Sequence, residues 1–452
     1  MLALAGAAAC SSDHPTAPVG PTYYRSSVAA NPVNNLSAIV TVDAARFDSA
    51  SLRFWIAGTD PKASPALPIG ADSTVQLAAL GLIPSSEYQI ETILYAGAKA
   101  FPVDTLAFIS GPRPAWIPQI GATGTDTTAG LLAISLPDGG VIVDNSGQVV
   151  WYAEMPAGTL NSFQPHANGT YTLLRADDLT RFHVLNTLGQ EIGTLTCLGY
   201  RTRFHDIIIR PGGDYWILCD DTRPMDLSSL GGQADATVTA TVIQHISASG
   251  DLLFEWNAFD HFEITELPVS DRDGANVNFT HGNGIELDRD GNLIASFRSL
   301  SEITKIDSKT GEILWRFGGL ANQFTIVNDP KGSFQRQHGI RVAGPSTIQF
   351  LDNGLTAPSR LVRYLLDPVD HTALLVLAFE DAPDTFTLVG GSSAYYPNGH
   401  GLVSYGQDGR VVEVNAAGNR AWELTGIDGR YVFRAERIRS LYDPVPLARA
   451  VP

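Results

Sequence analysis

The sequence predicts an all-β protein in which a small β-sandwich precedes a six-bladed β-propeller. Almost no stretch has the periodicity of an amphipathic helix. Short runs rich in Val, Ile, Leu, Tyr and Trp are instead separated by Gly, Asp and Asn turns, at intervals of about ten residues. Two short patterns also recur through residues 113–452, and repetition of this kind is typical of propellers.

Composition excludes several classes of protein. The chain has 452 residues, which is room for two domains. It carries 30 Lys and Arg against 47 Asp and Glu, a formal net charge of −17. This argues against a nucleic-acid partner, because nucleic-acid-binding surfaces are basic. Three Cys are too few for a disulfide-stapled mini-domain or a Cys-rich metal protein.

The first ten residues form a small apolar segment that ends in Ala8-Ala9-Cys10. This segment resembles the end of a bacterial lipoprotein signal, in which the cysteine is lipidated after cleavage; a frayed terminus is the alternative. The Pro-rich stretch His14–Pro21 is typical of a tether. Residues 1–21 are therefore predicted to be a signal and tether. The protein is expected to be exported to the periplasm or cell envelope, with Cys10 as a membrane anchor.

Two cysteines, Cys197 and Cys219, remain if Cys10 is an anchor. An exported protein could join them in a disulfide, because disulfides persist in oxidising compartments. Two buried free thiols are equally compatible with the sequence. Both alternatives stay open at this stage.

Residues 22–112 are predicted to form the β-sandwich. Two runs within it, Ala38–Asp43 and Ser51–Ile56, alternate apolar and polar side chains as half-buried strands do. Tyr88 opens a later strand after a turn, which is similar to the tyrosine corner of immunoglobulin-like and fibronectin-like domains. No catalytic group of residues is found in this part. The function is therefore sought in residues 113–452.

The repeats in residues 113–452 predict the propeller. One pattern is Gly-x-x-x-Trp, expected to close the outer hairpin of each unit; it begins at Gly147, Gly311 and Gly418, and with Phe254 in place of Trp at Gly250. The other is a strand, a Gly turn and another strand, which begins at Gly130, His205, His281, His338 and His400. One further unit between Leu160 and Gly199 brings the number of blades to six.

The same position in the repeat is held by four of the ten histidines: His205, His281, His338 and His400. Each is expected to open the first strand of a blade. Because first strands line the central channel of a propeller, the four imidazoles should converge at one mouth of it.

Arg298 indicates what such a mouth would bind. It stands where other units end their second strand in Asp144-Asn145, Asp220-Asp221 or Asp352-Asn353, and a cation at this place argues against a metal site. An arginine fork beside several imidazoles suits a tetrahedral oxyanion such as sulfate or phosphate. Neither a metal nor another cofactor is therefore predicted.

These residues resemble the motifs of the bacterial arylsulfate sulfotransferases. The matching segments are His205-Asp206, His281-x-Asn283, the Ser-x-Arg that ends at Arg298, Thr310–Gly319 and Gln337-His338. The resemblance covers most of residues 113–452 and, more loosely, the front domain. It implies a small β domain followed by a six-bladed propeller.

The resemblance also implies a sulfuryl transfer that needs no nucleotide sulfate donor. An aryl sulfate would give its sulfuryl group to a histidine, and a phenolic acceptor would take it in a second step, a ping-pong mechanism. His338 corresponds to the nucleophile. The groups around the sulfate correspond to His205, His281 and Arg298, and Asn283 to a further contact. His400 is predicted to contact substrate only from its position in the repeat.

Other functions and assemblies stay open. The segment Asp307–Trp315 is similar to the repeats of quinone-dependent oxidoreductase propellers. A non-catalytic binding propeller at the cell surface is the third alternative. A homodimer is also compatible with the sequence.

Overall fold

The computed structural model describes residues 23–156, 162–175 and 177–448. This part of the chain divides into two compact units. The first comprises the described residues through Ala29, with Ala38–Ala79 and Glu87–Phe108; the second comprises Ala30–Ser37, Leu80–Ser86 and the described residues from Ile109 onward. The predicted signal and tether, with Cys10, lie outside the described residues. Within the residues described, no helix is long and apolar enough to cross a membrane.

The first unit contains two sheets. One has the order β1 (Tyr24–Ala30), β2 (Ser37–Ala44), β6 (Thr74–Leu80); the other has the order β4 (Lys62–Ala63), β3 (Ser49–Trp55), β7 (Glu87–Ala96), β8 (Lys99–Ile109), with β5 (Leu67–Pro68) also on β3. More and less buried residues alternate along β2 and β7, because successive side chains of a strand point to opposite faces. An immunoglobulin-like or fibronectin-like topology stays a prediction.

The second unit contains six sheets among its described residues. From the inner strand outward, the first three are β35 (Ala435–Ile438), β10 (Leu131–Leu136), β11 (Gly139–Val143), β12 (Val149–Glu154); then β13 (Ser162–Pro165), β14 (Tyr171–Arg175), β15 (Asp178–Leu185), β16 (Glu191–Leu195); then β17 (Arg201–Ile209), β18 (Tyr215–Met225), β19 (Ala236–Ile246), β20 (Leu252–Asn257), with β21 (Asn276–Asn278) also on β19.

The other three sheets follow in chain order. They are β22 (Gly282–Leu287), β23 (Leu293–Phe297), β24 (Glu302–Ile306), β25 (Ile313–Gly318); then β27 (His338–Gly344), β28 (Thr347–Asp352), β29 (Arg360–Asp367), β30 (Thr372–Glu380), β26 (Thr325–Val327); then β31 (Ser392–Tyr395), β32 (Gly401–Ser404), β33 (Val411–Val414), β34 (Arg420–Thr425), β9 (Gly121–Thr123). Short 3-10 turns are η1 (Ser228–Leu230), η2 (Ala258–Asp260), η3 (Ile264–Glu266), η4 (Val269–Asp271) and η5 (Gly406–Asp408).

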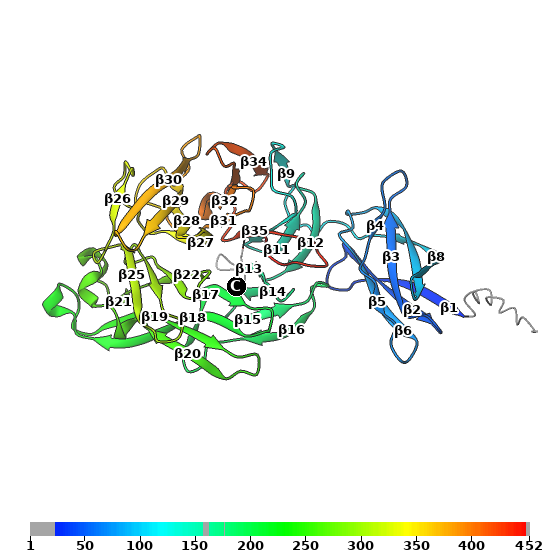
Figure 1. The fold of residues 1–452 in the computed structure, drawn as a ribbon, viewed down its shortest axis with the longest axis horizontal. Helices are drawn as coiled ribbons and strands as arrows, with labels where there is room; N and C mark the ends of the chain where they lie inside the picture. The colour runs from blue at the N-terminus through cyan, green and yellow to red at the C-terminus, as the bar shows by residue number, and fades with distance from the viewer. Residues whose placement is uncertain (1–22, 157–161, 176, 449–452) are drawn as a thin grey trace, which may run out of the picture. The chain divides into compact units, whose positions relative to one another are not determined.

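The six sheets surround a common centre, as a β-propeller does (Figure 1). Neighbouring inner strands contact one another from β17 through β22, β27 and β31 to β35. The ring is closed twice, because β9 pairs with the outer strand β34 and β35 pairs with β10. The ends of the described part of this unit are thus tied into sheets that the rest of the chain builds.

Tryptophans on outer strands join three of the six sheets to the next one. Three indole Nε1–H groups donate to a carbonyl in the turn before the outer strand of the neighbouring sheet: Trp151 to Thr187 (2.9 Å), Trp256 to Gly311 (3.2 Å) and Trp422 to Asn145 (2.9 Å). The sequence pattern aligned Phe254 with these tryptophans. The bond comes from Trp256, which lies two residues along β20 and therefore on the same face of the strand.

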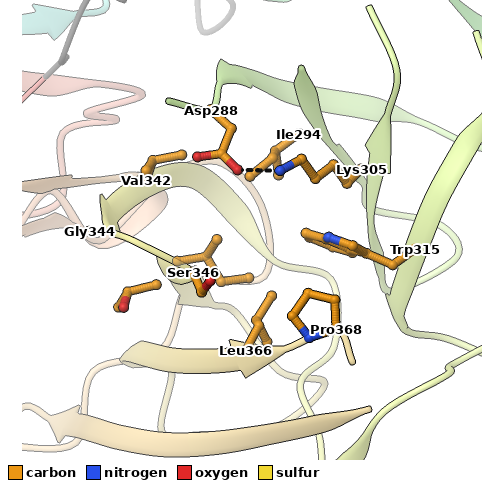
Figure 2. A pocket seen from close by; sticks show the side chains of 11 residues that line it. Asp288, Ile294, Lys305, Trp315, Val342, Gly344, Ser346, Leu366 and Pro368 are labelled. Carbon is orange, nitrogen blue, oxygen red and sulfur yellow. Dashed lines mark hydrogen bonds and ion pairs between the residues drawn. The ribbon is translucent and has the colours of Figure 1, made fainter. Parts of the chain in front are cut away.

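Trp315, on β25, has a different setting. With Leu366 and Pro368 it lines a cleft of about 40 Å³ between two sheets (Figure 2). Lys305 on the same lining donates to the Asp288 carboxylate (2.5 Å), at the end of β22 that lies away from His281.

Replacing Trp256 tests the inter-sheet hydrogen bond. Trp256→Phe should lower the free energy of unfolding by about 1 kcal/mol more than Trp216→Phe, because Trp256 loses a buried hydrogen bond. Trp216 is a matched control, since its buried Nε1 has no partner among the described residues. Urea unfolding measures both values. Equal losses in the two variants would show that the bond adds nothing.

Candidate functional site

Three predicted histidines come together at the inner strands of three consecutive sheets. His205 lies in β17, His281 directly precedes β22, and His338 is the first residue of β27. The Nε2 atoms of His205 and His281 are 3.2 Å apart, and the ring centroids of His205 and His338 are 6.4 Å apart. His205 and His338 are 3% and 2% exposed, so these two rings are shielded from bulk water, whereas His281 is half-buried.

Each of these inner strands is bulged where it carries the site. In β17 the pairing moves from Thr202–Cys219 to Ile207–Ile217, so four residues of β17, 203–206, face one of β18. Register shifts also lie between Gly282 and Gly284 in β22, and between His338 and Arg341 in β27. A bulge re-aims the side chains that it carries. The bulges therefore set the directions of the side chains that form this cluster.

The glycines after His281 and His338 allow adjoining sheets to approach closely. A Cβ on Gly339 would overlap the backbone of Ser392 and Ser393 on β31, and Gly339 has a φ of +64°, which favours glycine. A Cβ on Gly282 would overlap the side chain of Thr241 on β19. The His-Gly pairs thus follow from packing at the site.

The hydrogen bonds of His338 define its tautomer. Its Nδ1 lies 2.8 Å from Asn353 Oδ1 and 3.1 Å from the Arg336 carbonyl, so Nδ1 carries the proton and donates. The orientation of the Asn353 amide is fixed, because its Nδ2 donates to the carbonyls of Thr387 (2.9 Å) and Gly390 (3.1 Å). The lone pair of the ring is therefore on Nε2, which accepts a long bond from the Gly390 N–H (3.3 Å).

His205 and His281 form a second hydrogen-bonded unit. Asn278 Nδ2 lies 2.7 Å from His281 Nδ1 and donates to it, which leaves the His281 proton on Nε2 facing His205 Nε2. The His205 proton is then on Nδ1, a buried donor with no hydrogen-bond partner among the residues described. Burial, followed by the charge of Arg203, lowers the pKa of both imidazoles well below its usual range.

Three non-glycine residues at or near the imidazoles have left-handed backbone. His281, Ser301 and Arg336 have φ values of 51°, 52° and 58°, a region that non-glycine residues seldom occupy. Hydrogen bonds hold these positions: the Arg298 N–H donates to the His281 carbonyl, and the Arg336 N–H donates to Ser301 Oγ. The strained Arg336 is the residue whose carbonyl binds His338 Nδ1. Strain at such a place is typical of functional sites.

Arg298 is the cation that the sequence places beside the histidines. It follows β23, and its Nη2 donates to the Leu388 carbonyl (3.1 Å). Burial, and next the nearby Arg336 guanidinium, lower the pKa of Arg298 to about 10. Two further arginines that the sequence analysis missed, Arg203 and Arg336, act on the charge of His281.

Asn283 lies beside the residue that precedes His338. Its Nδ2 donates to the Gln337 carbonyl (2.7 Å), which joins β22 to the residue before His338. Its buried Oδ1 has no hydrogen-bond partner among the residues described, so one acceptor is left for a ligand.

His400 does not join the other imidazoles. It precedes β32, the second strand of its sheet, and its Nδ1 lies 2.9 Å from Glu413 Oε1. The prediction that it opens a first strand is wrong, because the first strand is β31, whose short Ser-Ser-Ala-Tyr sequence lacks an apolar run. No hydrogen bond or ring contact joins His400 to the three clustered histidines within the described ranges.

Aromatic side chains cover one side of the cluster. The Phe204 ring stacks on the His205 ring with centroids 3.9 Å apart, and Phe433 lies 5.8 Å from His205. Tyr431 stacks on Phe433 at 6.3 Å, and its hydroxyl lies against Gly390. No group of three or more His, Cys, Asp or Glu suited to a metal ion is found in the part of the chain that the structure describes.

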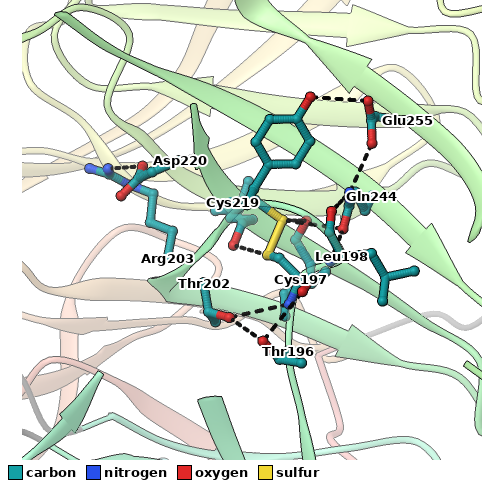
Figure 3. The surroundings of a disulfide bond; sticks show 12 residues. Thr196, Cys197, Leu198, Thr202, Arg203, Cys219, Asp220, Gln244 and Glu255 are labelled. Carbon is teal, nitrogen blue, oxygen red and sulfur yellow. Dashed lines mark hydrogen bonds and ion pairs between the residues drawn. A yellow bond between two sulfur atoms is a disulfide. The ribbon is translucent and has the colours of Figure 1, made fainter. Parts of the chain in front are cut away.

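Cys197 and Cys219 form a disulfide beside the bulge of β17 (Figure 3). Cys219 pairs with Thr202, the last regular residue before the bulge, and Thr202 Oγ1 accepts the Cys197 N–H (3.2 Å). The next residue, Arg203, is paired with Asp220. The disulfide thus anchors the start of the segment that carries Arg203 and His205.

Comparison with known protein families shows which family the chain belongs to. Residues 181–427, more than half of its length, match the arylsulfotransferase (ASST) family, and the matched range contains all three clustered histidines and Arg298. The chain belongs to the arylsulfotransferase family. No curated relative matches this arylsulfotransferase-family protein in sequence.

Solved structures resemble this arylsulfotransferase-family protein only distantly. A protein of unknown function from Bacteroides caccae is 11% identical, with a TM-score of 0.45 over 68% of this chain and 98% of that one. A streptogramin B lyase is also 11% identical, with a TM-score of 0.38 over 69% and 89%. Virginiamycin B lyase from Staphylococcus aureus is 10% identical, with a TM-score of 0.35 over 67% and 87%. Likenesses at this level carry no argument about function.

The pH dependence of stability tests the buried neutral state of His338. Burial, and next the charge of Arg298, lower its pKa to about 3, so between pH 6.5 and about 3 the unfolded chain binds one proton more than the folded protein at this residue. Stability should therefore fall as the pH is lowered through this window. His338→Asn should make that slope shallower by about 1.4 kcal/mol per pH unit. Urea unfolding from pH 7 to pH 5 measures it, and parallel curves would contradict the assignment.

Proposed function

We propose that this protein moves a sulfuryl group from an aryl sulfate to a phenolic acceptor by a ping-pong mechanism, with His338 as the nucleophile. The supporting observation is the tautomer of His338, because its Nδ1–H is held by Asn353 and by the Arg336 carbonyl. A neutral imidazole with its lone pair on Nε2 is competent to attack sulfur. Membership of the arylsulfotransferase family supports the same reaction.

In the first half-reaction His338 Nε2 attacks the sulfur atom. The N–S bond forms, the bond from sulfur to the aryl oxygen breaks, and the aryl oxide leaves. Arg298 would bind the negative oxygens of the transferred group, because it is a partly buried cation whose charge acts on His338. The Gly390 N–H loses its acceptor when Nε2 becomes bonded to sulfur, and it can then donate to a sulfuryl oxygen.

His205 and His281 provide a hydrogen-bond donor for the aryl oxygen. The His205 Nδ1–H, which has no hydrogen-bond partner among the described residues, can donate a hydrogen bond to the departing aryl oxide, and the His281 Nε2–H holds His205 in this tautomer across the 3.2 Å contact. The oxide leaves as the anion, because a neutral imidazole N–H is a far weaker acid than a phenol. In the second half-reaction the acceptor attacks the sulfur as a phenolate that has lost its proton to solvent, and the His205 Nδ1–H donates a hydrogen bond to the attacking oxygen. The N–S bond then breaks, and His338 regains its neutral form.

The aromatic cover supports an aryl substrate. Phe204, Phe433 and Tyr431 lie on the side of the cluster next to His205, and an aromatic ring of the substrate would pack on them in an offset or edge-to-face geometry. Burial raises the pKa of Tyr431 to about 12, so its hydroxyl stays protonated and can donate a hydrogen bond.

The proposal also covers the domain architecture and the location of the protein. Each of the six sheets would be one blade, and the first unit would be an immunoglobulin-like or fibronectin-like sandwich. Export to the periplasm or envelope agrees with the disulfide between Cys197 and Cys219, because disulfides persist in oxidising compartments.

Steady-state kinetics test the proposed reaction. With 4-nitrophenyl sulfate as donor, release of nitrophenol should continue only when an acceptor phenol is present, and reciprocal plots at several acceptor concentrations should be parallel. His338→Asn should lower kcat by at least about 10³-fold, because the nucleophile is lost. His400→Asn is the control and should keep activity. Unchanged turnover in His338→Asn would refute the assignment.

Asn353 is a positioning residue for His338, and the pH profile of kcat/KM distinguishes this role from a purely structural one. Asn353→Asp keeps an acceptor for His338 Nδ1–H, but the added negative charge should raise the pKa of the imidazole. Since the attacking form is neutral, the acidic limb of the kcat/KM profile should move to higher pH in this variant. Asn353→Leu should lower kcat by about 10²-fold through loss of the tautomer preference. A profile unchanged in shape would mean that Asn353 only supports the fold.

A further inference from the structure

Two of the three guanidiniums at the site are already neutralised by the protein. Arg203 Nη1 lies 2.5 Å from Asp220 Oδ1, and its Nε donates to the Gly282 carbonyl (2.8 Å). Arg336 Nη2 lies 2.5 Å from Asp271 Oδ2. Both pairs are largely shielded from water, which strengthens the attraction within each of them. These arginines therefore bring little net charge to the site.

Arg298 is the third guanidinium, and no carboxylate of the described residues forms an ion pair with it. Its Nη2 donates to a neutral carbonyl, and its buried Nε has no hydrogen-bond partner among the residues described. The three imidazoles are neutral at pH 7, and the Asp206 carboxylate next to His205 is paired with Arg434 (3.1 Å). Three guanidiniums and the two carboxylates of Asp220 and Asp271 leave a formal charge of +1.

We infer that this site is matched in charge to a monoanion, so that Asp271 and Asp220 select sulfate monoesters against phosphate monoesters. The two esters share a tetrahedral head and an aryl oxygen, but the sulfate carries one negative charge and the phosphate nearly two at neutral pH. A monoanion would leave the buried site neutral. A dianion would leave an unpaired negative charge in it, which is costly in a shielded site. This inference rests on the proposed function for its choice of substrate.

Asp271 is a better residue than Asp220 at which to change the net charge of the site. It ends the short turn η4, and its side chain is 26% exposed, so an amide of the same shape is tolerable there. Its charge acts on Arg298 as well as on Arg336. Asp271→Asn keeps an acceptor for Arg336 and raises the formal charge of the site to +2.

Binding of two unreactive analogues tests the inference independently of turnover. Benzenesulfonate and phenylphosphonate have the same ring and a similar head, and at about pH 9 they carry one and two charges. Calorimetry should show that the wild-type protein binds the sulfonate at least about tenfold more tightly than the phosphonate. Asp271→Asn should reduce this ratio by about tenfold or reverse it, because the added net charge favours the dianion.

Two further variants make the outcome decisive. Asp220→Asn should shift the ratio in the same direction, which guards against a folding defect specific to Asp271→Asn. Asp288→Asn is the matched control, since it removes a carboxylate from the ion pair with Lys305 at the other end of β22 (Figure 2) and should leave the ratio unchanged. A wild-type protein without preference, or a ratio unmoved in both site variants, would overturn the inference. Absence of sulfate turnover with an intact binding preference would count against the proposed function alone.

Discussion

The hydrogen bond from His338 Nδ1 to Asn353 Oδ1 determines which nitrogen of this imidazole can react. Asn353 holds the correct orientation because its amide group is bound to two carbonyls of the loop that ends in Gly390. The same loop supplies the carbonyl that binds Arg298 and the N–H that faces His338 Nε2. His338, the Arg298 cation and the Gly390 N–H donor are therefore held by one short segment between β30 and β31. The proposed chemistry depends on this segment keeping its shape.

Burial has a second consequence at the site. It lowers the pKa values of the three histidines, so the cluster contributes lone pairs and donors at neutral pH but no charge. The net positive charge then comes from Arg298, because Arg203 and Arg336 are paired with carboxylates. An acidic protein can thus bind an anion through a small and local excess of positive charge. The overall charge of −17 contains no information about that site.

The sequence predicted the all-β class and three of the four histidines that it placed in the channel. His205, His281 and His338 could be found because each belongs to a recognisable inner strand, and two of them precede a glycine that close packing requires. His400 was misplaced because β31 is too short and polar to be recognised. The Gly-x-x-x-Trp pattern pointed to Phe254, but the tryptophan that makes the hydrogen bond is Trp256. The two side chains lie on the same face of the strand because they are two residues apart, so the pattern could not tell them apart.

The residues that complete the site come from bulges and loops, where local sequence carries little information. Arg336 acts through a left-handed backbone, and Tyr431 and Phe433 come from the closing segment of the ring. One signal was present: Arg298 and Asn353 directly follow the second strands of consecutive sheets, and the sequence aligned them with Asp220, which lies within the longer strand β18. That position was used only to argue against a metal. It also identifies the partner of Arg203 and the residue that positions His338.

The most direct test of this account is the location of the covalent intermediate. The protein is incubated with an aryl sulfate in the absence of acceptor and digested at alkaline pH, and its peptides are examined by mass spectrometry. The account predicts one added sulfuryl group on the peptide that contains His338, and its loss when a phenol is added. A sulfuryl group on another residue, or sustained transfer to the acceptor with no modified peptide, would contradict it.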